Sequence, residues 1–184
     1  MKISILRVKS VHTKKFAAAA CVWLWAWPVA AGEAELLVLT RDLPGKFEIE
    51  RSEIEKPSFL PGAAAARTTI FRTDKLDSNR NHAGLQYIDA RYEHQSAANT
   101  DFDKIVRTVE DGESLSDEWK IVLQAQNEMH WLQAVCTMFE SSPAESFRQA
   151  YANLVVHAEA KGVRANRALL CGCETPCMTV AIDR

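Results

Sequence analysis

Three cysteines within one short segment are the residues of this sequence best suited to chemistry. Cys171, Cys173 and Cys177 form the segment CGCETPC, and Cys136 lies upstream. Deprotonated thiolates bind zinc or cuprous copper, with Cys136 or His157 as a fourth ligand. The spacing lacks the repeated CxxC pairs of structural zinc sites, and no basic neighbour is present to lower a thiol pKa for redox chemistry. A metal-binding or thiol-active site is therefore the alternative interpretation of this segment.

Disulfides are the leading interpretation of the same cysteines. Beyond the first 31 residues the chain has four cysteines, an even number that suits an oxidising compartment. A bond between Cys171 and Cys173 would close a very small, strained ring. We therefore expect Cys136 to bond to Cys171 or Cys173, with Cys177 closing a local loop.

The first 31 residues have the order of a secretory signal peptide. Five Lys and Arg residues and no Asp or Glu lie in residues 1–15, and residues 16–27 carry no charge. This segment is shorter than the roughly 20 residues of a spanning helix, but it fits the apolar region of a signal. The small residues that follow place cleavage after Ala31 or Ala34. An amphipathic or buried N-terminal helix is the alternative, and lipidation of Cys21 is disfavoured because most of the apolar run follows it.

The charge that remains after cleavage is acidic. Removal of residues 1–31 leaves 17 basic residues against 24 acidic ones. Nucleic acid is therefore not expected as a ligand, since binding to phosphate backbones comes from clustered Lys and Arg. The membrane would be contacted only through the uncleaved signal.

Other chemical motifs in the sequence are incomplete. Asp77, Asn79 and Asn81 occupy the first oxygen positions of a calcium loop, but His82 replaces the required glycine. The histidines have no serine elbow, HExxH motif or paired carboxylates beside them. The sequence predicts no catalytic residue and no cofactor.

The first half of the chain predicts strands. A continuous apolar run at residues 35–40 is typical of a strand buried on both faces. Further strands are predicted around residues 47–49, 68–72 and 88–92, with a loop rich in proline, glycine and alanine at residues 57–66.

The second half predicts three helices. Apolar residues recur at helical spacing from about residue 101, and a longer amphipathic helix is expected over about residues 117–140. Ser142, Pro143 and Glu145 form a capping box for a third helix that Gly162 ends. The last two helices would form an antiparallel hairpin.

These elements predict one α+β domain over residues 32–184. A small sheet from residues 35–95 would pack on a helical region from residues 101–162. The cysteine-rich tail, residues 163–184, would be held to that region by disulfides.

One segment resembles a known family. Residues 38–55, VLTRDLPGKFEIERSEIE, are similar to the opening of SAF or β-clip domains, which occur in periplasmic proteins that assist assembly of pili and the flagellar ring. The similarity rests on Arg41 to Pro44, on Gly45, on Ile49 and on Glu53 with Ile54. It implies a strand before Arg41, a role in assembly and no active site.

Taken together, these patterns predict a periplasmic or secreted protein without enzymatic activity. We expect it to act as a binding or assembly factor, stabilised by disulfides, with a protein partner in the cell envelope. The alternative function is that of an envelope protein that uses the cysteine cluster to bind metal or react through a thiol.

The order of the first 34 residues makes a prediction about the native N-terminus. Protein purified from its natural host is expected to begin at Gly32 or Glu35, because a peptidase that needs small side chains cuts after Ala31 or Ala34. N-terminal sequencing checks this expectation. Recovery of Met1 would contradict export and the oxidised state of the cysteines.

Overall fold

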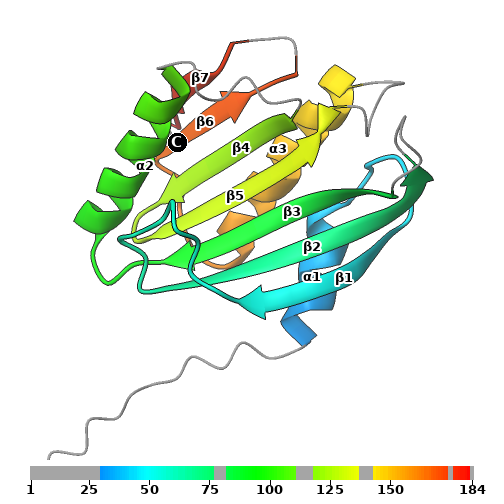
Figure 1. Ribbon diagram of the computed structural model, residues 1–184, viewed down its shortest axis with the longest axis horizontal. Coiled ribbons are helices and arrows are strands. Elements are labelled where there is room, and N and C mark those ends of the chain that lie inside the picture. Colours follow the sequence, from blue (N-terminus) through cyan, green and yellow to red (C-terminus); the bar gives the residue numbers. More distant parts are fainter. Residues whose placement is uncertain (1–29, 77–81, 111–117, 137–142, 174–175, 183–184) are drawn as a thin grey trace, which may run out of the picture.

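The computed structural model describes residues 30–76, 82–110, 118–136, 143–173 and 176–182 (Figure 1). In chain order the elements are α1 (Ala30–Leu39), β1 (Phe47–Ile54), β2 (Ala65–Leu76), β3 (His82–Arg91), α2 (Gln95–Glu110), β4 (Glu118–Ala125), β5 (Glu128–Val135), α3 (Pro143–Ala160), β6 (Arg167–Cys171) and β7 (Met178–Ala181). The residues of the predicted signal before Ala30 lie outside the described part. Within that part, no helix is long and apolar enough to cross a membrane.

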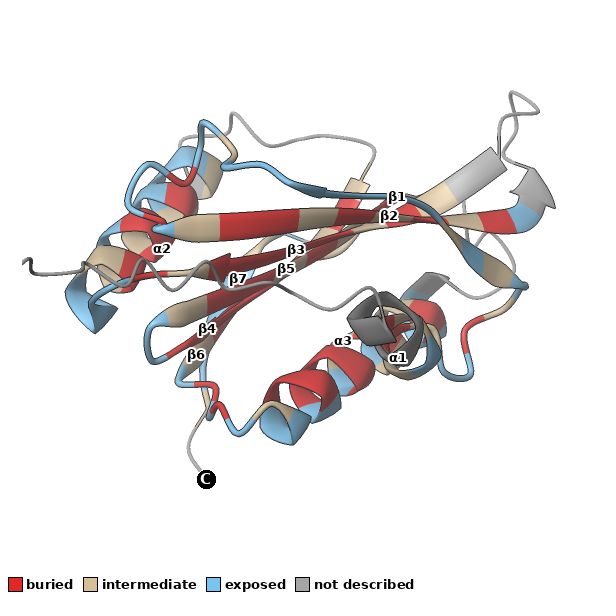
Figure 2. Ribbon diagram, turned by 90° about the horizontal axis from the view of Figure 1, so that it is seen from below, coloured by how far each residue is buried: buried red, intermediate tan, exposed pale blue. Residues whose placement is uncertain are grey.

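One antiparallel sheet forms the centre of the molecule. Its seven strands have the order β1-β2-β3-β5-β4-β6-β7. Helices α1 and α3 cover one face of the sheet, and α2 covers one end of the other face (Figure 2). The α+β class is confirmed, but the sheet is larger than predicted and has helices on both faces.

Each face of the sheet carries its own apolar core. Under α1 and α3, the core includes Leu39, Phe71, Leu85, Tyr87, Trp119, Ile121, Leu123, Leu132 and Leu154. Under α2, it includes Leu60, Ile88, Tyr92, Phe102, Ile105, Val122, Met129 and Leu169. Successive residues of a strand point to opposite faces, so the central strands supply both cores.

Residues 35–40 form the end of a helix, which corrects the strand predicted there. In α1 the buried residues Glu35 and Leu39 are four positions apart, while Leu37 is exposed. The amide of Asn153 on α3 donates to the carbonyls of Leu39 and Arg41, which satisfies acceptors that the helix end leaves free. The apolar run is therefore half-buried on a helix, with α3 supplying the cap.

Strands β4 and β5 replace the helix predicted over residues 117–140. They form a hairpin whose turn contains Gln126, at φ 53°, and Asn127. The prediction was wrong because β4 is buried on both faces. Apolar residues therefore occupy most of its positions, including those that are three or four residues apart and match a helical pattern. The side-chain amide of Gln124 donates to the carbonyl of Gln126, which supports a turn without glycine. The predicted helical hairpin is therefore absent from the described residues.

Several other predicted elements are confirmed. Strands β1, β2 and β3 cover the predicted strands, and α2 and α3 cover the first and third predicted helices. Gly162 has a φ of 77° at the end of α3, as expected of a left-handed terminating residue. The predicted cap Ser142 lies outside the described residues.

Two disulfides link the C-terminal strands. Cys136 follows β5 and bonds to Cys173, which follows β6, so this bond spans the intervening strand β4. Cys171 bonds to Cys177 and closes the connection between β6 and β7. Of the two partners that the sequence left open for Cys136, the structure has Cys173. The tail forms two strands of the sheet, whereas the prediction had it held to a helical region.

The two disulfides are expected to differ in their contribution to stability. The first joins residues 37 positions apart and the second joins residues 6 apart. Loop-closure entropy predicts that replacing Cys136 and Cys173 with Ala lowers the free energy of unfolding by about 4 kcal/mol, against about 2 kcal/mol for Cys171 and Cys177. Urea denaturation of the oxidised double variants measures both losses. An equal or larger loss for the short loop would contradict this account.

Candidate functional site

The face of the sheet that carries α2 is open over its other half. Helix α2 covers the end of the sheet beside β6, while β1, β2 and part of β3 lie beyond it (Figure 2). A groove of about 340 Å³ lies on this uncovered part. Its volume is in the range of small ligand pockets.

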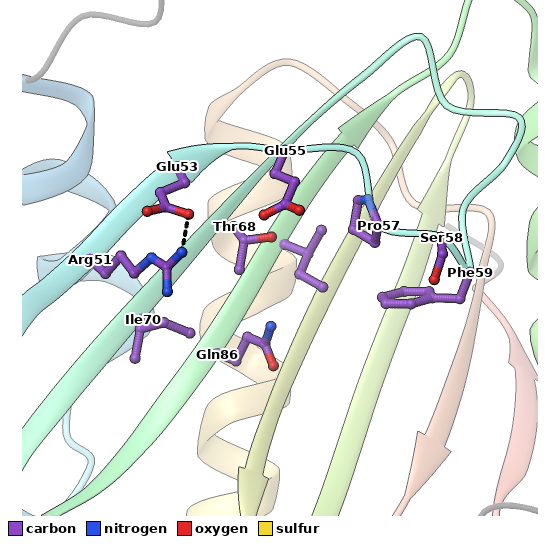
Figure 3. A pocket seen from close by; sticks show the side chains of 10 residues that line it. Arg51, Glu53, Glu55, Pro57, Ser58, Phe59, Thr68, Ile70 and Gln86 are labelled. Atoms are coloured by element: carbon purple, nitrogen blue, oxygen red, sulfur yellow. Dashed lines mark hydrogen bonds and ion pairs between the residues drawn. The ribbon is translucent and has the colours of Figure 1, made fainter.

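The groove has an apolar floor and a charged rim. Figure 3 shows the connection after β1 passing over β2 and β3, with its side chains around the open space. The residues that line the groove are Arg51, Glu53, Glu55, Pro57, Ser58, Phe59, Thr68, Ile70, Gln86 and Ile88. Ile88 is buried and Ile70 half-buried, whereas Arg51 and Glu53 are exposed and form an ion pair.

Amide and aromatic side chains beside the groove are held in place by contacts with one another. The Gln133 amide donates to the Gln86 carbonyl oxygen at 2.7 Å, and the Trp131 indole donates to Gln133 at 2.7 Å. The ring of Phe59 lies 5.0 Å from that of Trp131. These contacts hold the groove's wall against β5.

A buried polar cluster lies on the opposite face, beneath α1 and α3. Strand register places Arg67 of β2 opposite Asp89 of β3, and Asp89 opposite His130 of β5. Two residues along the same strands, Arg91 is opposite Glu128. Asp89 and His130 are both fully buried. The cluster therefore crosses the centre of the sheet.

The hydroxyl of Tyr87 joins two histidines in this cluster. It lies 2.9 Å from Nδ1 of His130 and 3.1 Å from Nε2 of His157 on α3. A hydroxyl donates once and accepts through its oxygen, so it donates to one imidazole and accepts from the other. The tautomers of the two histidines are thereby linked.

Ion pairs attach both helices to the sheet at this cluster. Glu35 of α1 pairs with Arg67, and Lys161 at the end of α3 pairs with Asp89. Lys161 Nζ also lies 3.4 Å from Glu35 Oε1. Because burial makes an unpaired charge costly, these contacts satisfy the charges that the helices bury.

The pKa values follow from this burial. Burial raises the pKa of Glu35, and the charges of Lys161 and Arg67 offset that rise only in part. Burial also acts to raise the pKa of Asp89, but interactions with His130 and Lys161 outweigh it and hold this pKa below its ordinary value. Burial lowers the pKa of His157 to about 3. His157 is therefore neutral at physiological pH.

The predicted site residues do not come together as a metal site. All four cysteine sulfurs are paired in disulfides, so none is a free thiolate in this structure. His157 faces Tyr87 in the buried cluster. The calcium-loop candidates Asp77, Asn79 and Asn81 lie outside the described residues.

Sequence reasoning missed both the groove and the buried cluster. Asp89 and Arg91 alternate with apolar residues in the predicted strand, and in the structure they lie on the face that α1 and α3 cover. His130 and Glu128 were placed in a helix, which hid their register with β3. The alternation of Tyr87, Asp89 and Arg91 was a usable signal, but only with β5 recognised as a strand.

No protein-family model matches this chain, and no curated protein or solved structure shows a significant similarity to it. The resemblance of residues 38–55 to SAF or β-clip domains therefore stays a prediction. In the structure, α1 occupies the position of the strand that this resemblance implies before Arg41.

The low pKa of His157 predicts a loss of stability in mild acid. The unfolded chain protonates this histidine near pH 6.5 and the folded chain only near pH 3, so unfolding takes up a proton between these values. The free energy of unfolding should fall by up to about 1.4 kcal/mol per pH unit below about pH 6. Urea denaturation across pH 7 to about 5.5, where ordinary carboxylates remain mostly ionised, measures this slope.

His157→Gln is expected to flatten the slope, and His94→Gln, at an exposed position, is the control that should retain it. If His157→Gln does not fold, the NMR titration of His157 in the unmodified chain replaces it. A midpoint near pH 6.5 would contradict the predicted burial effect.

Proposed function

We propose that this chain is an exported binding factor of the cell envelope, without enzymatic activity, that holds an extended segment of a protein partner in the groove beside β1. The observation that carries the proposal is the open half of the sheet face, with its apolar floor and charged rim. Export and the envelope location rest on the signal-like N-terminus and on disulfides that suit an oxidising compartment.

The groove's chemistry favours binding over catalysis. Its titratable lining residues are Arg51, Glu53 and Glu55, and all three are exposed. The lining has no cysteine, histidine or lysine to act as a nucleophile or general base, although Ser58 and Thr68 supply hydroxyls. The groove therefore offers apolar contact and hydrogen bonds rather than an activated group.

The rim indicates the charge of the partner. The charged residues that line the groove are Glu53 and Glu55 against Arg51, which pairs with Glu53, so the rim carries a net negative charge. A complementary partner segment carries basic side chains for this rim and an apolar side chain for the floor between Ile70 and Phe59. Complementary charge speeds the encounter, while the apolar contact supplies most of the affinity.

The edge of β1 is less suited to the partner than the groove. A register irregularity between Ile49 and Arg51 interrupts the pairing of β1 with β2, and the strand carries several glutamates. Bulges and charged side chains protect sheet edges against added strands. The partner is therefore placed across the groove and not as an eighth strand.

Site-specific photo-crosslinking in the natural host tests this proposal. A benzophenone amino acid replaces Phe59, which is 41% exposed, and the matched control replaces Val156, which is 44% exposed on α3. We expect one protein adduct from position 59 and none from position 156. Equal adducts from both positions would contradict a specific groove.

A second substitution tests whether crosslinking at position 59 depends on the groove floor. Ile70→Arg places a charge where the partner's apolar side chain would lie, and should abolish the adduct because a buried unpaired charge is strongly disfavoured. Leu37→Arg, at a 73% exposed position on α1, is the control and should leave the adduct unchanged. Glu53→Gln should weaken it by less than about fivefold, as expected for an exposed ion pair worth about 0.2–1 kcal/mol. An adduct that survives Ile70→Arg would overturn the proposal.

A further inference from the structure

Three ligand-type atoms in the buried cluster have no hydrogen-bond partner. They are Oδ1 of Asp89, Oε2 of Glu128 and Nε2 of His130. Asp89 and His130 are fully buried, and the side chain of Glu128 is 16% exposed. Buried polar atoms are nearly always paired, so a group of three unpaired atoms requires an explanation.

The three residues also face one another. Each offers a ligand atom, and these atoms lie within 4.8 Å of one another. Glu128 Oε2 is 3.5 Å from His130 Nε2, and Asp89 Oδ1 is 3.7 Å from His130 Nδ1. Because Nδ1 is held by Tyr87, Nε2 is the ring nitrogen that remains free for another ligand.

We propose that Asp89, Glu128 and His130 form a binding site for one divalent transition-metal ion, with zinc the best match. Two carboxylates and one imidazole are ligands that zinc accepts, at about 2.0–2.2 Å from the metal. Tetrahedral ligands at that bond length lie about 3.3 Å apart. The separation of Glu128 Oε2 from His130 Nε2 is close to this value. The Asp89 oxygen lies farther out, within the 4.8 Å that spans the three ligand atoms, and would have to approach the other two on binding.

The surrounding residues orient these ligands as neighbours of metal sites commonly do. Lys161 holds Oδ2 of Asp89, and Arg91 Nε lies 3.6 Å from Oε1 of Glu128. Lys161 thus holds one oxygen of Asp89, and a cation lies beside one oxygen of Glu128, while the second oxygen of each carboxylate is left for the metal. Tyr87 can accept the Nδ1 proton of His130, which leaves Nε2 as the metal-binding nitrogen.

A water molecule or a second proton on His130 could also satisfy these three atoms, and the test has to distinguish both from a metal ion. A water molecule can donate to both carboxylates and accept from an Nε2 proton of His130. A second proton on His130 places its positive charge between the carboxylates. The cations Lys161 and Arg91 oppose a metal ion, but their side chains are 23% and 27% exposed and remain partly hydrated. Metal binding therefore has to be measured directly.

The test titrates zinc into the oxidised mature chain after chelator treatment. Isothermal titration calorimetry is expected to show one zinc ion per chain. Glu128→Gln, which keeps the side chain's size, should weaken binding at least tenfold. Glu118→Gln alters a carboxylate of similar length at the start of β4 and should bind as the unmodified chain does.

A separate control excludes an exposed histidine. His94→Gln removes a histidine just before α2 and should not change zinc binding. Nitrogen chemical shifts of His130 should show Nε2 as the zinc-bound atom. Absence of stoichiometric zinc binding would assign the three atoms to water or a proton and overturn the proposal. Binding that Glu128→Gln leaves intact, or that His94→Gln abolishes, would also overturn it.

The proposed zinc site is independent of the groove, because the groove lies on the other face of the sheet. Loss of crosslinking at Phe59 leaves the zinc measurement unchanged, and absence of zinc binding leaves the crosslinking measurement unchanged.

Discussion

The register between β3 and β5 is the constraint on which both candidate sites depend. This pairing joins the three N-terminal strands to the four strands that follow in the sheet, and it places Asp89 opposite His130 and Gln86 opposite Gln133. Asp89 and His130 belong to the buried cluster, whereas Gln86 and Gln133 lie on the open face. A shift of one residue would move each side chain to the wrong face, so the two faces are fixed together.

The buried cluster in turn fixes the helices on its side of the sheet. Glu35 on α1 and Lys161 after α3 both reach it, although they lie far apart in the chain. An isolated buried charge is costly, so helix positions that break these pairs are disfavoured more strongly than small changes of apolar packing. The charged pairs therefore restrict how the two helices lie on the apolar core. The hydrogen bonds from Asn153 to the end of α1 add a directional contact to this restriction.

Local signals in the sequence predicted those elements whose boundaries depend on local chemistry. Gly162 ends α3, and the alternation around Ile49 and Ile88 marks strands. The prediction failed at β4, where Ile121, Val122 and Leu123 are consecutive and all buried. A strand that is buried on both faces lacks the alternation of apolar and polar residues that distinguishes a strand from a helix. The prediction failed at α1 because the cap comes from Asn153, more than a hundred residues away. The predicted bonding of Cys136 agreed with the structure although the helical hairpin predicted around it was wrong, because small-ring strain alone had limited the choice of partner.

The candidate sites could not be predicted for a related reason. A groove on a sheet face exists only once strands from different parts of the chain are paired and one part of the face remains uncovered. Helix α2 covers the end beside β6, where Arg167 stacks over Phe102 and pairs with Asp103. The two disulfides link β5 to β6 and β6 to β7 on that same side of the sheet. The opposite end is left uncovered beside an edge strand. The partner segment proposed above would contact a surface that is already formed there, so the sheet itself would lose little conformational entropy on binding.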